Sequence, residues 1–372
     1  MKNRAKKIIA VMLIAVTVIG AAGFTMEPSY AAVSNKTKVV APSGKKDNTD
    51  YKNITSALKK YKTVKLKKGK KYYLSSPILL RSDRKIVATG ATIVAKKGIM
   101  YSPLKKGGYS NLKNITVKGG TWKSSAKNGF SKTSIGVVHG TNIKFTDMVI
   151  KAPNYSGHAF EFVGCQNVTV DNVKIQPVAA NKGANQETMI QIDIAVDATY
   201  PAFKGTKFGD GTTCKNVVIR NSTIRGNRGI ATGYSYKDDK YINKVHTGVT
   251  LENNTITAYG GEGVFLVGAK DAVVRNNTIV SNYTASTSDK ATGLHILGVG
   301  NEPNTKFTVT GNTVKGYKYG IRAYSRTSTP LNTVIITGNK TYCKAGEAPA
   351  IQADTKYITN LTKENNTQAK WN

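Results

Sequence analysis

Two short runs of alternating apolar and polar residues stand in the stretch Gly157-His158-Ala159-Phe160-Glu161-Phe162-Val163-Gly164-Cys165-Gln166-Asn167-Val168-Thr169-Val170-Asp171-Asn172-Val173-Lys174-Ile175. The first run is centred on Phe160 and Phe162 and the second on Val168 and Val170, and a Gly-Cys-Gln-Asn corner separates them. Alternation of this kind is typical of a strand with one buried face. The stretch therefore predicts two strands joined by a tight corner.

The end of this stretch, a polar corner followed by an apolar anchor, recurs along the chain. The recurrences are Val217–Ile224, Val249–Ile256, Ala272–Ile279 and Phe307–Val314, and more loosely Ile115–Trp122, Ile143–Ile150 and Val334–Thr341. Their period is roughly 23 to 35 residues, with one gap of about twice that length, and such spacing is typical of a solenoid. Val, Ile, Thr and Phe fill the strands and Asn and Gly the corners, without helical spacing between them. We therefore predict an all-β fold, a right-handed parallel β-helix.

Asparagine recurs at one position of the corners, as in Asn253-Asn254-Thr255 and Gly311-Asn312-Thr313. One interpretation is a ladder in which stacked Asn side chains bond from coil to coil. The other is that Asn is simply a residue that turns accept readily. The sequence favours neither.

The chain opens with the features of an export signal. A basic segment, residues 1–7, precedes an apolar run at Ile8–Ala22, and Ser29-Tyr30-Ala31 supplies small residues around a cleavage point. The run is short for a membrane span of about 20 residues, and no second apolar stretch of that length follows. We therefore expect residues 1–31 to be a signal peptide, and the mature protein to be secreted, extracellular and without a membrane span.

The composition is strongly basic, with 55 Lys and Arg against 21 Asp and Glu and a formal net charge of +34. The cations are concentrated between Lys45 and Lys127, where the acids are Asp47, Asp50 and Asp83. Such a charge attracts polyanions, and outside a cell these are anionic polysaccharides and cell-wall polymers. No specific binding of nucleic acid is expected, because Lys predominates and no stacking aromatic motif accompanies it. A generally basic protein without a specific ligand is the alternative.

Residues 32–48 are polar and are expected to form a linker. Apolar residues then follow at helical spacing: Ile54, Ala57, Leu58 and Tyr61. They predict a short amphipathic helix over Asp50–Tyr61, with Asp50 or Asn53 as its cap. This helix would cover the open end of the coil, which otherwise exposes unpaired strand edges. Residues 49–372 are then one β-helix domain, which we expect to be a monomer.

Three features occur together in this chain: Asp47-Asn48-Thr49-Asp50 before the predicted helix, Val64-Lys65-Leu66…Gly69…Tyr72-Tyr73-Leu74 after it, and repeated Asn-Asn-Thr-Ile endings. In these features it resembles the pectin-lyase-like superfamily of secreted, right-handed parallel β-helix proteins, over nearly the whole mature length. The resemblance implies the fold. It leaves the function open among lyases, hydrolases, epimerases and pure binders, because such folds host all of them.

The superfamily's hydrolases use several aspartates on adjoining coils, an exposed Gly-His-Gly and an Arg-x-Lys. The loosely comparable segments here are Gln191-Ile192-Asp193, Gly157-His158 and Gly320-Ile321-Arg322. An adjacent Asp-Asp pair is missing, and Ala323-Tyr324 follows Arg322. Hydrolysis needs two carboxyl groups, for which Glu161 and Asp193 are candidates. A lyase of this kind needs a base beside Ca²⁺ or an Arg cluster, so Ca²⁺ is a candidate cofactor.

Counting back from each corner puts the first strands of successive coils in register. One column then holds Glu161, Gln191, Ala231, Phe265, His295, Arg322 and Gln352. The residue before each of these is apolar and must face the core, so this column faces outward. A solvated strand face in so basic a protein would be rich in Lys, and this column has none. We therefore favour a saccharide groove over a merely solvated face.

Long segments flank this column at Gln176–Thr188, Val196–Thr213 and Gly233–Lys244, and long loops on a rigid coil commonly form binding walls. We expect the catalytic residues to be Asp193, Arg228, His246 and His158. We expect the substrate-binding residues to be Glu161, Gln191, Tyr234, His295, Arg322 and Tyr324. Each histidine taken singly also fits a structural role, but convergence of Asp193, Arg228 and His246 on one cavity would favour an enzyme.

No paired His, Cys-x-x-Cys or tight acidic run indicates a metal site, so we assign no metal ligands. Cys165 and Cys214 share one corner register, and the doubled gap predicts that they lie two coils apart, too far for a disulfide. We expect small buried thiols instead.

The sequence thus predicts a secreted, polysaccharide-engaging β-helix, either a lyase or a glycoside hydrolase acting on an anionic, uronate-type polysaccharide. The alternative is a non-catalytic surface or adhesion module that binds anionic envelope polymers through its basic first coils.

Overall fold

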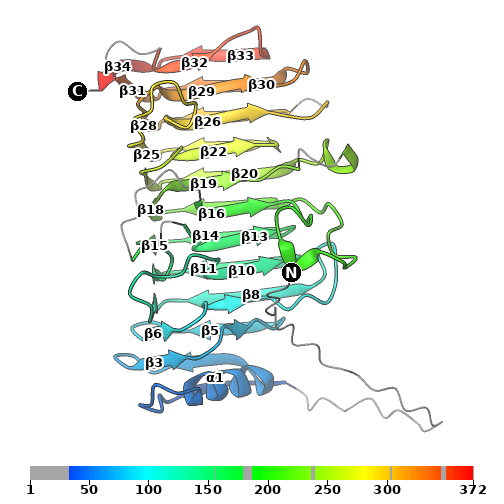
Figure 1. The fold of residues 1–372 in the computed structure, drawn as a ribbon, viewed down its shortest axis with the longest axis vertical. Coiled ribbons are helices and arrows are strands. Elements are labelled where there is room, and N and C mark those ends of the chain that lie inside the picture. Colours follow the sequence, from blue (N-terminus) through cyan, green and yellow to red (C-terminus); the bar gives the residue numbers. More distant parts are fainter. Residues whose placement is uncertain are drawn as a thin grey trace, which may run out of the picture. The chain divides into compact units, whose positions relative to one another are not determined.

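The computed structural model describes residues 33–154, 156–178, 187–235, 239–301, 304–344 and 349–371. The predicted signal peptide, residues 1–31, lies outside these ranges. Within them the chain winds into a stack of coils that begins at α1 (Thr49–Lys60) and ends at β34 (Thr367–Trp371), as Figure 1 shows. None of the helices described is long and apolar enough to cross a membrane.

Three parallel sheets run along the stack. The 13-stranded sheet contains β1 (Ser34–Val40), β2 (Tyr61–Leu66), β5 (Arg84–Val87), β8 (Leu112–Lys118), β11 (Gly140–Thr146), β14 (Gln166–Asp171), β17 (Lys215–Arg220), β20 (His246–Glu252), β23 (Ala269–Lys270), β24 (Ala272–Arg275), β27 (Phe307–Thr310), β30 (Leu331–Thr337) and β33 (Ile358–Glu364). The 10-stranded sheet contains β4 (Ile78–Leu79), β7 (Met100–Tyr101), β10 (Ile135–Val138), β13 (Phe160–Val163), β16 (Thr188–Asp193), β19 (Arg228–Thr232), β22 (Val264–Val267), β26 (Thr292–Gly298), β29 (Tyr319–Ser325) and β32 (Ile351–Ala353).

The 11-stranded sheet contains β3 (Lys71–Leu74), β6 (Thr92–Ala95), β9 (Thr121–Ser124), β12 (Val149–Lys151), β15 (Lys174–Ile175), β18 (Thr223–Gly226), β21 (Thr255–Ala258), β25 (Thr278–Ser281), β28 (Thr313–Lys315), β31 (Lys340–Lys344) and β34. Two short 3-10 turns, η1 (Pro201–Phe203) and η2 (Asp239–Tyr241), lie in the connections. Each coil visits the three sheets in turn, so the predicted right-handed parallel β-helix is confirmed.

The doubled gap in the repeat is one enlarged coil, not two. β14 pairs directly with β17, with Val168 opposite Val217, and the extra residues lie in the connections on either side of β16. The prediction that Cys165 and Cys214 lie two coils apart is therefore wrong. They occupy neighbouring coils, and the Cys165 amide donates to Cys214 Sγ at 3.3 Å. Both thiols are free and fully buried, as expected.

The core is the space enclosed by the three sheets. Its largest fully buried side chains include Trp122, Tyr72, Phe145, Phe160 and Phe162. Phe160 and Phe162 come from the stretch that predicts the fold, and their rings stack with centroids 5.6 Å apart. Burying one such side chain stabilises the fold by about 1.5–3 kcal/mol. Alternation along each strand therefore supplies the main stabilising term.

The asparagines form the hydrogen-bonded ladder. The ladder runs from Asn254 through Asn277, Asn312 and Asn339 to Asn366. The side-chain amide of each of the first four donates to the side-chain oxygen of the next asparagine, one coil further on, over 2.9–3.0 Å. The same oxygens also accept backbone amides, and all but the last are buried. The residues before two of them, Asn253 and Asn276, have φ of 55° and 56°, a left-handed conformation that Asn accepts readily.

We expect Asn277→Leu to lower the free energy of unfolding by about 2–4 kcal/mol. Leu has a similar volume, but it leaves the buried amide of Asn254 and the carbonyl of Leu251 without the partners they have now. Denaturant unfolding of the purified variant measures this loss. Exposed Asn360→Ala on β33, outside the ladder, is the control; an equal loss in both variants would contradict a special role for the ladder.

The N-terminal end matches the sequence prediction only in part. α1 forms and buries Ile54, Ala57 and Leu58, as its apolar spacing predicts. The predicted capping role of Asp50 is wrong, because its buried carboxylate accepts the amides of Ser43 and Tyr73 at 2.6 and 2.9 Å. The prediction that residues 32–48 are a linker is also wrong for β1, which pairs in parallel with β2. The apolar residues of β1 are Val39 and Val40 alone, so pairing with β2 rather than an apolar pattern forms this edge strand.

Candidate functional site

The register counted from the corners is the register of the 10-stranded sheet. Pairing runs from strand to strand through Glu161, Gln191, Ala231, Phe265, His295, Arg322 and Gln352. The preceding residues, such as Ile190 and Leu294, are fully buried in the core. The column therefore lies on the outer face, as predicted. Several of its members are nevertheless shielded from solvent by the connections that cross this face.

A cavity of about 550 Å³ lies on this outer face, between β16 and β26. Gln191, Arg228, Tyr234 and His295 of the predicted residues line it, together with Glu262 and Phe265. Lys290 and Arg326 also line it from the connections that follow β25 and β29. The cavity thus combines aromatic rings, cations, one imidazole and two carboxylates, those of Glu262 and Asp289. We call it the sheet cavity.

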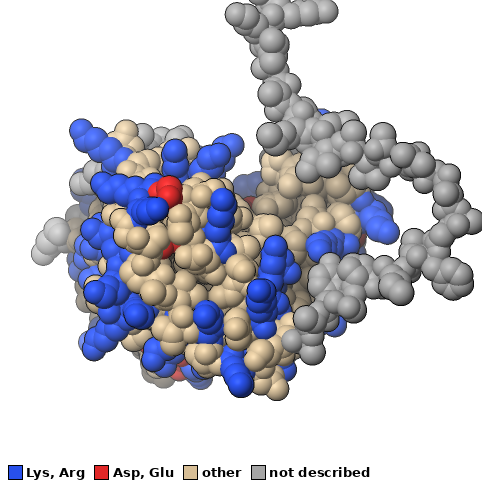
Figure 2. All heavy atoms as spheres, turned by 90° about the horizontal axis from the view of Figure 1, so that it is seen from below, with Lys and Arg blue, Asp and Glu red and all other residues tan. Residues whose placement is uncertain are grey.

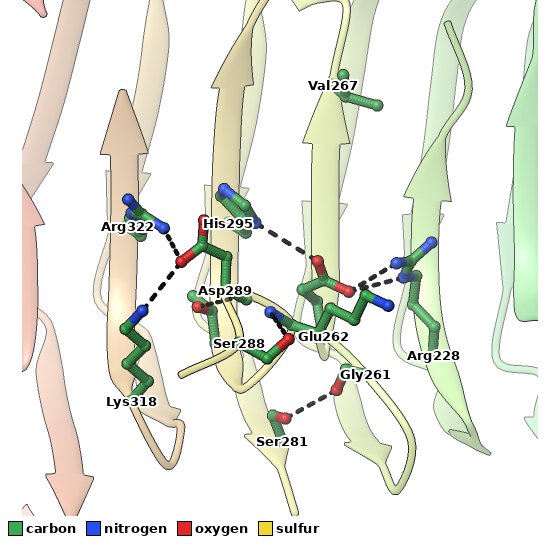
Figure 3. Close-up of polar contacts among 12 residues, drawn as sticks. Arg228, Gly261, Glu262, Val267, Ser281, Ser288, Asp289, His295, Lys318 and Arg322 are labelled. Atoms are coloured by element: carbon green, nitrogen blue, oxygen red, sulfur yellow. Dashed lines mark hydrogen bonds and ion pairs between the residues drawn. The ribbon is translucent and has the colours of Figure 1, made fainter. Parts of the chain in front are cut away.

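Arg228, Glu262 and His295 form a continuous polar chain in the sheet cavity (Figure 3). Both Arg228 Nη2 and Nε contact Glu262 Oε2, at 2.8 and 2.9 Å. The other oxygen, Glu262 Oε1, lies 3.5 Å from His295 Nδ1. Arg228 also stands over the Phe265 ring, 5.1 Å from its centroid. Strands β19 and β26, with the residue two positions before β22, thus hold one guanidinium, one imidazole and one carboxylate in fixed positions.

Burial alone would raise the pKa of Glu262, but the hydrogen bond from His295 and the charge of Arg228 outweigh it and lower that pKa. Glu262 is therefore ionised and accepts from His295 Nδ1, which places the imidazole proton on Nδ1. Burial lowers the pKa of His295, more than the Glu262 carboxylate raises it. His295 is thus a neutral imidazole near neutral pH. Its Nε2 is buried and has no hydrogen-bond partner among the described residues.

A second polar group adjoins His295 and contains the predicted Arg322 and Tyr324. The Tyr324 ring stacks on His295 with centroids 5.6 Å apart, and Arg322 stands 4.1 Å from the Tyr324 centroid. Asp289, on the connection before β26, forms an ion pair with Arg322 and another with Lys318 Nζ at 3.2 Å (Figure 3). These groups brace His295 from the side away from Glu262.

The predicted Glu161 and Asp193 form a buried acidic pair on neighbouring coils. Each of the two residues is only 5% exposed. Glu161 accepts a hydrogen bond from the hydroxyl of Thr133, and Asp193 accepts one from Gln191 Nε2 at 2.7 Å. Burial raises the pKa of Glu161. Burial and the charge of Glu161 together raise the pKa of Asp193 to about 7. Gln191 connects this pair to the sheet cavity, which it lines.

The two histidines that were predicted to be catalytic, His158 and His246, have different surroundings from His295. His158 lies beside the acidic pair, with Nδ1 2.5 Å from the carbonyl of Thr188 and Nε2 3.4 Å from a Glu187 oxygen. His246 is buried, and its ring joins backbone groups only: Nδ1 accepts the Cys214 amide at 2.9 Å and Nε2 donates to Gly233 O at 2.7 Å. Burial lowers the pKa of His246 to about 4. Both nitrogens of His246 are therefore occupied in holding the corner.

The expected convergence of Asp193, Arg228 and His246 does not occur. Asp193 bonds Gln191, Arg228 bonds Glu262, and His246 bonds the backbone. The structure instead brings Arg228 and His295 together around Glu262, which the sequence analysis missed. Ile230 pairs with Val264, the first residue of β22. Continuing this register two residues back along both chains would have placed Glu262 beside Arg228. Asp289 carried no such signal, because it lies on a connection that the repeat does not constrain.

Tyr234 keeps its predicted place at the edge of the sheet cavity, but the excursion that carries it is described only in part: Tyr236 lies outside the described residues. The same holds for residues 179–186 of the connection before β16. Across the described residues, no cluster of three or more His, Cys, Asp and Glu side chains is arranged to hold a metal ion.

Comparison with known proteins agrees with the fold. Residues 160–341 match the family described as "Right handed beta helix region". No curated protein sequence matches the chain. Among solved structures, PfbA, a surface adhesin of Streptococcus pneumoniae, is 15% identical with a TM-score of 0.62, over 89% of this chain and 91% of that one. The A-module of the Azotobacter vinelandii mannuronan C-5 epimerase AlgE6 is 13% identical with a TM-score of 0.46, over 90% and 88%.

At such identities the likeness shows the fold alone. The sheet topology and the family match together define the fold of the protein, a right-handed parallel β-helix. The fold that the resemblance implied is thereby confirmed.

Proposed function

We propose that this protein is a secreted, monomeric polysaccharide lyase that binds an anionic, uronate-type chain in the sheet cavity and cleaves it by β-elimination. The observation that carries the proposal is the environment of the His295 side chain. Its imidazole is neutral, Glu262 fixes its orientation, and its Nε2 has no partner among the described residues. A buried polar atom without a partner, in a residue that lines a cavity, is a candidate for contact with a ligand.

The proposed chemistry is removal of the proton on the carbon next to a uronate carboxylate. His295 Nε2 takes this proton, and the electron pair of the C–H bond forms the 4,5 double bond. The C4–O glycosidic bond then breaks, and its oxygen leaves and is protonated by solvent. The reaction requires a base with a pKa near or below the working pH and positive charge beside the carboxylate. His295 provides the base.

The cations of the sheet cavity suit the second requirement. Lys290 and Arg326 line it beside the Arg228–Glu262 ion pair, and a guanidinium such as that of Arg326 can hold a carboxylate through two parallel hydrogen bonds. The rings of Tyr234 and Phe265 offer flat surfaces for the faces of sugar rings. The excess of positive charge over the whole chain would also attract a polyuronate to the surface.

A screen of the mature protein, residues 32–372, on uronate and neutral glycans tests this proposal. We expect 4,5-unsaturated products from a uronate polymer. His295→Gln keeps a polar side chain but removes the base, so turnover should fall at least about 100-fold. Gln352→Ala, in the same column but outside the sheet cavity, is the control and should be unchanged. Parallel assays with Ca²⁺ and with a chelator measure any dependence on this cation.

Two other results would each replace the lyase. New reducing ends without unsaturated products would point to hydrolysis, for which the buried pair Glu161 and Asp193 is the candidate. Binding of a uronate without any product would favour the non-catalytic adhesion module, which the likeness in fold to a surface adhesin makes worth testing.

A further inference from the structure

A second hollowed surface lies on another face of the coil, along the outer side of the 11-stranded sheet. Two adjoining hollows of about 510 and 640 Å³ share Lys123, Ser124 and Ser125 in their walls. The first begins at Lys71 and Tyr73 of β3, and the second ends at Arg225 of β18 and at Tyr259. Because they share walls, they form one channel that crosses successive coils. We call it the basic groove.

The strand register aligns the groove with the coil axis. Tyr73, Val94, Lys123 and Lys151 pair in one column through β3, β6, β9 and β12. The column continues to Gln176 and Arg225, because the residues before them pair as Ile175 with Ile224. Neighbouring strands are about 4.8 Å apart. The six strands from β3 to β18 thus carry this column over roughly 24 Å.

The groove is strongly positive. Its cationic lining residues are Lys46, Lys71, Lys96, Lys123, Lys127, Lys151 and Arg225, and its acidic lining residue is Asp47. None of the ion pairs found in the described ranges involves these seven cations. Figure 2 views the molecule from the α1 end, where blue Lys and Arg side chains project around the coil and red acidic ones are few. The positive charge is therefore available to a ligand.

We propose that the basic groove is a binding site for a linear anionic polysaccharide, lying along the coil axis and separate from the sheet cavity. A chain in this direction meets a new cation on most coils, which suits a polymer with charge at regular intervals. Between the cations, Ser124, Ser125 and Gln176 offer hydrogen bonds to sugar hydroxyls, and Tyr73 and Tyr259 offer ring faces. Stacked aromatics of the kind that bind nucleic-acid bases are not among the lining residues.

The sheet cavity and the basic groove would give the protein two independent binding sites for polysaccharide. The groove goes beyond the proposed lyase activity and does not depend on it, since its residues lie on a different sheet. Binding at the groove would keep the protein attached to a polyanionic matrix while the sheet cavity engages another segment.

A charge-matched pair of variants tests the groove. The first carries Lys123→Gln, Lys151→Gln and Arg225→Gln. The second carries Lys65→Gln, Lys85→Gln and Lys144→Gln, three exposed cations of the 13-stranded sheet, so both lose three charges. The probes are an oligogalacturonate, an inorganic polyphosphate and neutral dextran, with affinity measured by calorimetry at two salt concentrations. His295→Gln, combined with each set, keeps the oligogalacturonate from being consumed.

We expect the groove variant to weaken oligogalacturonate binding at least about tenfold, and the control variant to weaken it far less. Binding should also fall as salt rises past physiological strength, where the Debye length is about 8 Å. Equal weakening by both sets would mean that only net charge attracts the probe, and would overturn the site. Polyphosphate binding tighter than oligogalacturonate would overturn the assignment to a polysaccharide. Neither outcome bears on turnover at the sheet cavity, which the unsaturated products report.

Discussion

Leu294→Asp is expected to prevent folding. Leu294 is fully buried in the core of the coil, where it precedes the outward His295 on β26. The substitution removes a buried apolar side chain, which stabilises the fold by about 1.5–3 kcal/mol, and adds a carboxylate without a partner. The unpaired buried carboxylate costs several kcal/mol more, so the combined loss approaches the roughly 5–15 kcal/mol by which domains are commonly stable. Soluble expression and circular dichroism measure the outcome.

His295→Ala is the matched comparison, one residue further along β26. It removes a ring stack and a hydrogen bond to Glu262, so a loss of about 2–4 kcal/mol is expected, with the β-helix retained. If Leu294→Asp folded and melted as the original protein does, the assignment of inward and outward positions on this sheet would be wrong.

Asp193→Asn is expected to change how stability depends on pH. In the folded protein the Asp193 pKa is raised to about 7 from 3.8, first by burial and then by the charge of Glu161. Between these values the unfolded chain has lost the proton that the folded protein keeps. The free energy of unfolding therefore falls as pH rises through this window, by up to about 1.4 kcal/mol per pH unit, and levels off above the folded pKa.

Asn cannot ionise, so the variant lacks this decline. Relative to the original protein, it should gain on the order of a few kcal/mol between about pH 4 and pH 8. Denaturant unfolding at several pH values measures the difference. Asp171→Asn is a control of opposite sign: hydrogen bonds from Asn221 and Arg220 and the charge of Arg220 hold the Asp171 pKa down against burial. Parallel stability curves for Asp193→Asn and the original protein would show that Asp193 is not a buried acid.

The sequence could predict most of the fold because the repeat constrains it locally. Alternation around Phe160 and Val168 specifies strands, and the corner asparagines specify where coils turn and how they stack. Counting from those corners then puts His295 beside Arg322 without further information. The coil number was misjudged at Cys165 and Cys214 because spacing alone cannot tell a second coil from long connections. β1 was missed because an edge strand beside a polar segment has little apolar pattern.

The site was harder to predict for a physical reason. A column shows which residues are neighbours, but side-chain direction at a strand end depends on the connection that enters it. His246 was expected to transfer protons, and it binds backbone groups at such an end. Glu262 follows two glycines, outside any alternating run, yet the stacking of β22 on β19 brings it to Arg228. Asp289 is placed by its loop alone, which the repeat leaves undefined.

The enlarged coil between β14 and β17 also bears on protein engineering. It holds about twice the residues of an ordinary coil, yet Val168 and Val217 pair as neighbouring strands do elsewhere. The coils on either side of it keep their alignment, so a connection can be lengthened without a change in how the coils stack. Foreign recognition segments could therefore be grafted at the exposed residues 204–207, between Phe203 and Phe208, which pack against the coil. A family of receptors with different specificities could share this one rigid frame.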